Sequence, residues 1–430
     1  MPTKSQLSIV FALCAAISMW LYVTPLLQPY ITGRDYSAEV VGGPFSDIYP
    51  SWFGTKEFIV NHHSPYGKEV SQSIQITYYG HVLGTGDPRN QQRFAYPIYI
   101  VFLFAPTVWM PFHIVQLLGF WALAAITAAS VPLWLQVVKW DVSWPTLATL
   151  QLLVLSSIGV VHGLELQQLS LLVSGMIAAG ALLIVRRRFL AGGCLFGLAM
   201  IKPQLLLLPI LWLLIWSLSN WKERKRFVIG FSATLAILIG AGELILPGWI
   251  SQFITGALAY EQYAHPTSVI EMLLGHRVSV LSALLLGLIL VRICFLFRSV
   301  PPDSSDFAFT LALVLAANLF IMPLMSPYNH ALFVPGVLLL LRSDKQLWVE
   351  RWLWKLTVGT LLWPWVTAAL LVALSGLHSP LARTWIDLPL YSTLVLPVMI
   401  TAMLMSQALR RHEVSNSDLQ DLQIPSLLRG

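Results

Sequence analysis

"AMIKPQLLLLPILWLL", residues 199–214, places a lysine and a proline in the middle of a long apolar run. Because proline cannot donate a backbone hydrogen bond, Pro203 should break this run into two helical segments, 189–201 and 203–219. Broken backbone at membrane depth is tolerated only where it lines a cavity or packs against protein. An ionisable side chain there is costly and by default marks a site or a pathway. The stretch predicts a helical membrane protein with a polar site at Lys202.

The composition of the whole chain agrees with this interpretation. Of its 430 residues, 57% are hydrophobic and 11% charged, whereas soluble domains carry about 25% charged residues. The net charge of +6 lies mainly in short basic clusters between apolar runs, which indicates orientation signals and not nucleic-acid binding. The three cysteines lie inside apolar runs, without the spacing of a disulfide framework or a zinc site.

The apolar runs predict an all-α polytopic membrane protein with about twelve spans (eleven to thirteen). We expect one transmembrane domain over residues 1–412 and a polar, disordered cytoplasmic tail over 413–430. The first run has no small-residue cleavage site at its end, so we expect a retained signal anchor. The expected spans are 7–27, 113–138, 145–162, 168–185, 189–201, 203–219, 227–247, 278–297, 307–325, 330–341, 352–374 and 389–409.

The basic clusters predict how these spans are oriented. With the N-terminus and C-terminus in the cytoplasm of a plasma-membrane protein, twelve spans place every cluster inside. The proline-rich stretch 96–111 must then form a re-entrant or interfacial hairpin. The clusters are 186–188, 222–226, 298, 342–345 and 410–411. The segments left on the outer face are the large first loop 28–95, then 163–167, the break at Lys202, 248–277, 326–329 and 375–388.

"SDIYPSW", residues 46–52, opens the helical part of the large outer loop. Asp47 lies among aromatic residues that suit sugars or lipid head groups, and a carboxylate that reaches a substrate proton can act as a general base. Alternatively, Ser46 or Asp47 caps an amphipathic helix that includes residues 53–61. The residue types leave both interpretations open.

Three further motifs carry polar groups on the expected outer face. The Lys202 ammonium can bind a phosphate or merely snorkel to the interface. His330, in "MSPYNHALF", can exchange a proton near neutral pH or pack as an interface residue. The motif "LELQQLS" contains Glu165, Gln167 and Gln168, which can bind hydroxyl groups or form an ordinary loop. The sequence contains no Asp-x-Asp pair for a nucleotide-sugar metal site and no glycine-rich phosphate loop.

Taken in order, these stretches resemble the GT-C superfamily of membrane glycosyltransferases, and within it glycosyltransferase family 87. The resemblance covers about residues 40–341 and rests most on the Lys-Pro-Gln break and on the Tyr-Pro hairpin at Tyr96. It implies a GT-C-like fold and a sugar, most simply mannose, taken from a polyprenyl-phosphate donor. The acceptor would be a lipid-linked molecule or a glycan on the outer face, and the transfer would be inverting, without metal or other cofactor.

The resemblance also suggests roles for particular residues. It implies that Asp47 and His330 are catalytic and that Lys202 lies near the donor phosphate. We also expect donor phosphate or substrate to be bound by Arg93, Tyr96, Glu165, Gln167 and Arg277. The alternative functions are a polymerase or ligase of lipid-linked glycans, and a transporter or flippase of lipid-linked sugars. A transporter should show paired broken helices in two related halves, and the sequence shows one clear break and no internal symmetry.

Overall fold

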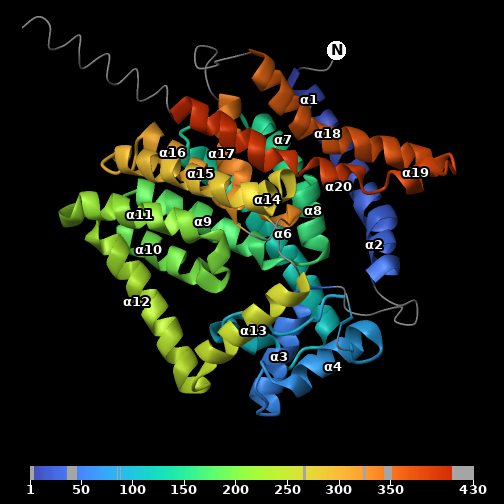
Figure 1. Cartoon of the computed structure of the whole chain (residues 1–430). Helices are drawn as coiled ribbons and strands as arrows, with labels where there is room; N and C mark the ends of the chain where they lie inside the picture. Colours follow the sequence, from blue (N-terminus) through green and yellow to red (C-terminus); the bar gives the residue numbers. More distant parts are fainter. Residues whose placement is uncertain are drawn as a thin grey trace, which may run out of the picture.

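The computed structural model describes residues 4–35, 46–84, 86–87, 89–264, 268–322, 326–342 and 351–408, and over these ranges it contains helices and no β-strand (Figure 1). The expected tail 413–430 and the basic residues 343–345 and 410–411 lie outside this part. The N-terminal helix α1 (Lys4–Tyr22) continues through a π-helical turn (Val23–Leu27), at Pro25, into α2 (Gln28–Asp35). The C-terminal part contains α18 (Arg351–Gly376), α19 (Leu381–Thr384) and α20 (Leu388–Ser392).

Six helical segments of the described chain are long and apolar enough to cross a membrane. They are Gln6–Ile31, α6 (Phe112–Val137), α12 (Trp221–Ile245), α15 (His276–Leu296), Lys355–Gly376 and Leu388–Ala408. A seventh is added if α7 (Trp144–Leu155) and α8 (Ile158–Glu165), which are bent by 59° at their junction, form one span. The protein is therefore a multi-pass membrane protein.

The other expected spans are helices of shorter length. A 17-residue helix covers about 25 Å, less than the roughly 30 Å of the hydrocarbon core. The count of about twelve spans is thus not confirmed, although each expected span contains helix. These shorter helices are α9 (Leu169–Val185), α10 (Phe189–Leu198), α11 (Leu207–Ser219), α16 (Ser305–Ile321) and α17 (Val334–Arg342).

The proline-rich stretch 96–111 contains short helical segments. It contains a 3₁₀ turn (Ile98–Ile100), α5 (Val101–Phe104) and a second 3₁₀ turn (Ala105–Thr107). The Tyr99 hydroxyl donates to the carbonyl of Met200 at 2.7 Å, so this segment is attached to the chain just before Lys202.

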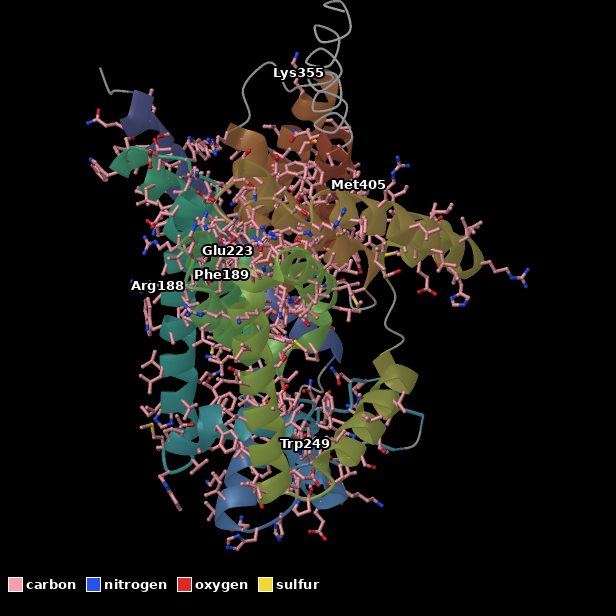
Figure 2. The ribbon with its side chains drawn as sticks, turned by 90° about the vertical axis from the view of Figure 1, so that its left-hand side faces the viewer. Arg188, Phe189, Glu223, Trp249, Lys355 and Met405 are labelled. Carbon is pink, nitrogen blue, oxygen red and sulfur yellow. The ribbon has the colours of Figure 1, made fainter. Side chains whose placement is uncertain are left out.

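The large first loop forms a helical layer at one end of the molecule. Helices α3 (Tyr49–Val60), α4 (Lys68–Tyr79) and α13 (Trp249–Ala264) gather at the lower end of Figure 1, below the main bundle. Tyr49 packs edge-to-face on Phe112 of α6, with ring centroids 4.9 Å apart. Helix α12 runs from the bundle down to α13, and Figure 2 shows Trp249 at the end of this path, far from Glu223.

Glycines set the close contact of α10 with α12. A Cβ atom on Gly193 would lie 2.1 Å from the carbonyl oxygen of Phe227, and one on Gly230 would lie 2.2 Å from that of Leu190. Small residues at such a contact let two helix backbones approach closely, which is how helices commonly associate in membranes. The helix that precedes the Lys202 break is fixed to α12 in this way.

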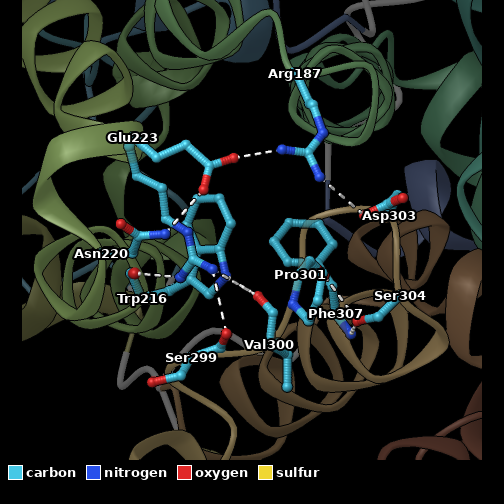
Figure 3. A network of polar contacts seen from close by, with 11 residues as sticks. Arg187, Trp216, Asn220, Glu223, Ser299, Val300, Pro301, Asp303, Ser304 and Phe307 are labelled. Carbon is cyan, nitrogen blue, oxygen red and sulfur yellow. Dashed lines mark hydrogen bonds and ion pairs between the residues drawn. The ribbon is translucent and has the colours of Figure 1, made fainter.

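A polar network lies at the end of α9 that is distant from Lys202. Arg187 pairs with Glu223 at 2.5 Å and with Asp303 at 3.6 Å, as Figure 3 shows. Buried Arg224 donates to the carbonyl of Val300 at 2.9 Å. Two of the basic clusters expected in the cytoplasm, 186–188 and 222–226, therefore meet at this end. Helix α9 separates them from Gln168, which precedes its first residue.

Candidate active site

A cavity of about 350 Å³ forms where the helical layer meets the main bundle. The residues that line it come from 47–51, 90–97, 201–205, 253–257 and 326–329, with Gln168, Leu319 and Met322. Most of these ranges belong to segments that the sequence assigns to the outer side. The fold thus brings into one cavity polar groups that are far apart in the chain.

Asp47 is held at the cavity by its own backbone and by its neighbour Ser46. The Asp47 amide donates to the carbonyl of Leu166 at 2.8 Å. The hydroxyl of Ser46 donates to Oε1 of Gln167, and the carbonyl of Ser46 accepts from Tyr78 at 2.7 Å. Helix α3 has Ile48 at its N-cap and no side-chain capping bond. The capping interpretation of Ser46 and Asp47 therefore does not hold.

Burial changes the proton affinity of Asp47. Loss of solvent raises the pKa of this carboxyl from its ordinary value to about 6, because a buried anion is disfavoured. The positive charge of Lys202 acts in the opposite direction and lowers the same pKa. Asp47 therefore remains largely ionised at neutral pH, with a pKa in the range that suits a general base.

Lys202 points inward, so the snorkelling interpretation fails. Its side chain is 8% exposed. The ammonium donates to Oε1 of Gln168 at 2.6 Å and to the hydroxyl of Ser170 at 2.9 Å. It also lies over the rings of Tyr96 and Tyr328, 5.7 and 5.4 Å from their centroids. A lysine carries three donor hydrogens, and the same residue lines the cavity.

Asn318 stabilises the broken backbone around Lys202. The break lies between a 3₁₀ turn (Ala199–Ile201) and a second one (Pro203–Leu205). The fully buried Asn318 side chain accepts from the amide of Leu208 at 3.1 Å and donates to the carbonyl of Gln204 at 2.9 Å. It thus replaces hydrogen bonds that the break removes. The sequence signal was an asparagine inside the apolar run of α16.

Arg93 and Tyr96 also line the cavity, in the segment that enters the hairpin. The Arg93 guanidinium donates to Oε1 of Gln91, and the carbonyl of Tyr96 accepts from the hydroxyl of Tyr66 at 2.8 Å. The cavity lining also includes Gln168, which belongs to the polar motif "LELQQLS", and Gln92 and Asn329, which were not selected from the sequence.

Four residues expected in the site are not among those that line the cavity. His330 packs against α8, where a Cβ atom on Gly159 would lie 3.4 Å from its Cβ. Glu165 accepts from the hydroxyl of Thr24 at 2.8 Å, and Arg277 is exposed at the start of α15. Gln167 is buried next to Ser46, away from the cavity surface. Within the described ranges, no three His, Cys, Asp or Glu residues are placed to hold a metal ion.

Comparison with known families decides the identity of this chain. The profile of glycosyltransferase family 87 matches residues 94–327, which is more than half of the sequence. The chain belongs to glycosyltransferase family 87. It is therefore a membrane glycosyltransferase, as the resemblance predicted.

Some residues that line the cavity lie within the matched region, and others precede it in the sequence. Lys202 and Gln168 lie within the matched residues of this glycosyltransferase, whereas Asp47 precedes them. Neither the search of curated proteins nor the search of solved structures found a match.

Proposed function

We propose that this glycosyltransferase moves a sugar, with mannose as the expected one, from a polyprenyl-phosphate donor to a lipid-linked or glycan acceptor. The reaction takes place on the outer face of the membrane and inverts the configuration of the sugar carbon. The observation that carries the proposal is a single cavity lined by a carboxylate with a raised pKa and by a buried ammonium, Asp47 and Lys202.

The lining of the cavity suits a donor with a charged head and an apolar tail. Its polar part includes Asp47, Arg93 and Lys202, and its apolar part includes Phe253 and Leu319. Helix α13 supplies part of the apolar wall, and its exposed residues Ile250, Ile254 and Leu258 are also apolar. These apolar side chains offer an isoprenoid chain a path from the cavity into the bilayer.

The proposed chemistry is a single displacement. Asp47 accepts the proton of an acceptor hydroxyl as its oxygen bonds to the sugar carbon. The bond from that carbon to the phosphate oxygen breaks, and the polyprenyl phosphate leaves with the electron pair. Lys202 binds the phosphate, whose negative charge is already present in the donor before the bond breaks. A displacement from the side opposite the leaving group inverts the carbon, and it needs one base only.

Orientation follows from the position of the basic clusters. The network around Arg187 and Glu223 lies at the opposite end of α9 from Gln168, which lines the cavity. If the basic clusters are cytoplasmic, the cavity opens on the outer side. This supports an outer-face reaction in the plasma membrane, with a lipid-linked donor supplied from within the bilayer.

The proposal is tested by the choice of donor. Purified protein is incubated with membrane lipid extract and a radiolabelled sugar, supplied either as polyprenyl phosphate or as nucleotide sugar. We expect labelled product from the polyprenyl phosphate alone, with no loss of activity in EDTA. Transfer from the nucleotide sugar, or abolition by EDTA, would contradict the proposal. Movement of the intact donor between leaflets, without product, would favour a flippase.

A further inference from the structure

One short connection touches both residues of the proposed mechanism. Residues 166–170 comprise the connection between α8 and α9 and the first two residues of α9. They supply the backbone acceptor for the Asp47 amide and two hydrogen-bond acceptors for Lys202. Leu166 and Gln167 contact the Ser46–Asp47 segment, whereas Gln168 and Ser170 contact Lys202. Neighbouring side chains of one connection thus serve opposite parts of the site.

Gln167 is fixed at both ends of its amide. Its Oε1 atom accepts from the Ser46 hydroxyl, and its Nε2 atom donates to the carbonyl of Gln116 in α6. The side chain is 2% exposed. Gln167 therefore connects Ser46, the residue before Asp47, to α6 of the bundle.

Gln168 and Ser170 fix the ammonium in a directional chain of hydrogen bonds. Lys202 donates to both, and the hydroxyl of Ser170 donates in turn to Oδ1 of Asn329 at 2.7 Å. The proton of Ser170 is committed to Asn329, so its oxygen is oriented to accept from Lys202. This chain holds the ammonium at a defined position although a lysine side chain is flexible.

The backbone explains how adjacent glutamines reach different partners. Gln167 has φ of +54°, in the left-handed region that is uncommon for residues other than glycine. The resulting turn directs the Gln167 side chain toward Ser46 and α6, and leaves Gln168 at the cavity. A residue in this conformation costs free energy, and the hydrogen bonds at Ser46 and Gln116 hold it there.

We propose that residues 166–170 act as one bracket that sets the position of the base relative to the phosphate-binding ammonium. Gln167 is the positioning residue for Asp47, and Gln168 is the positioning residue for Lys202. The inference rests on the function proposed above, and it replaces the expectation that Gln167 contacts substrate.

The bracket predicts that two adjacent residues affect different constants, Gln167 the value of kcat and Gln168 the donor affinity. Gln167→Met should lower kcat on the order of tenfold to a hundredfold with little change in donor affinity, because the base is misplaced. Gln168→Met should weaken donor affinity about fivefold, the effect of one lost hydrogen bond, with kcat at saturating donor nearly unchanged. Gln168→Glu should weaken it on the order of tenfold or more, because a carboxylate then competes with the donor phosphate for Lys202.

Second variants distinguish positioning from a general loss of folding. Ser46→Ala removes the same hydrogen bond from the side of Ser46 and should lower kcat as Gln167→Met does. The double variant should then have a kcat no lower than that of the worse single variant. Gln167→Gly keeps the left-handed turn and should still lose rate, whereas a purely backbone role would leave it active. Gln151→Leu is the matched control, because Gln151 makes a side-chain bond to the carbonyl of Ala128 away from the cavity.

The experiment measures kcat and donor dissociation constant for each variant, beside Asp47→Asn and Lys202→Ala. The crossed pattern, kcat for Gln167 and affinity for Gln168, supports the bracket. The bracket would be overturned if kcat and donor affinity fell equally in both glutamine variants, or if neither variant changed either quantity. If Asp47→Asn and Lys202→Ala are themselves fully active, the proposed function fails first. If those two behave as proposed and the crossed pattern is absent, the bracket alone fails.

Discussion

Asp47 and Lys202 influence one another across the cavity that both line. The pKa of Asp47 rises to about 6 through burial, and the Lys202 charge holds it lower than burial alone would. Lys202 therefore has two effects in the proposed mechanism. It favours the ionised form of Asp47, and it binds the negatively charged phosphate of the donor. A change at either residue should be visible in the behaviour of the other.

This coupling predicts a pH dependence with a definite direction. Transfer requires ionised Asp47, so kcat/KM should be constant near neutral pH and fall as the pH drops below about 6. Lys202→Met removes the charge that lowers the Asp47 pKa, so this acid limb should move to higher pH. Profiles of wild type and variant, measured with the same donor, test the shift. An acid limb that moves to lower pH or stays in place would contradict the coupling.

Replacement of Lys202 tests donor binding. Lys202→Ala should weaken donor affinity on the order of tenfold to a hundredfold, because a hydrogen bond to a charged group contributes about 1.5–3 kcal/mol. Lys202→Arg should recover only part of this loss, since the guanidinium differs in shape and reach. Binding of a non-reacting polyprenyl phosphate to the purified variants measures the effect. Wild-type affinity in the alanine variant would remove Lys202 from the donor site.

Single residues show how far the sequence leads. Lys202 could be selected because a charge in an apolar run needs a reason, and Asp47 because a carboxylate follows the first span. His330 carried the same kind of signal, yet it packs on α8 instead of lining the cavity. Ser170 could not be selected, because an ordinary polar residue in a helix acquires meaning only from its three-dimensional partners. Asn318 carried one signal, an asparagine in an apolar run, but its partners are known only from the fold.

At the scale of elements, the break between α10 and α11 depends on a third helix. Two backbone groups at the break bond to Asn318 of α16, at Leu208 and Gln204. In a membrane-embedded region such groups cannot turn to water instead. The site therefore includes α16 as a structural support, although only its C-terminal end reaches the cavity.

Asn318→Leu should accordingly destabilise the break. Each buried backbone group left without a partner costs about 1–3 kcal/mol, so the variant should unfold at a lower temperature in detergent and lose donor affinity with it. Asn61→Leu is the control, since Asn61 contacts Glu57 at an exposed position and should change stability little. A melting temperature for Asn318→Leu equal to that of Asn61→Leu would show that the break does not need this support.

The sequence predicted where helices occur better than where each helix begins, ends or bends. The Lys202 break was visible because proline interrupts an apolar run. Hydropathy does not reveal where a helix begins within an apolar run, so a helix was expected from residue 203, whereas α11 begins at Leu207 after a 3₁₀ turn. The 59° bend between α7 and α8 was also invisible, because "LSSIG" contains no proline and carries only a weak turn signal.

At the scale of the whole molecule, the account requires the first loop and the basic clusters to lie on opposite sides of the membrane. In a variant without the three native cysteines, Glu69→Cys in α4 should react with an impermeant thiol reagent added to intact cells. Lys225→Cys in α12 should react only after the membrane is opened, and both positions are exposed. Labelling at position 225 and not at 69 in intact cells would reverse the orientation.

The central claim is that Asp47 removes the acceptor proton during sugar transfer, and the rate of Asp47→Asn tests it most directly. The amide keeps the size of the carboxylate but cannot accept the proton, so transfer from polyprenyl-phosphate sugar should fall about 10²–10⁴-fold. Donor binding and expression should stay at the wild-type level, and Asp141→Asn, at an exposed position, should be fully active. Transfer by Asp47→Asn within about twofold of wild type, well inside the effect of losing a general base, would contradict the account.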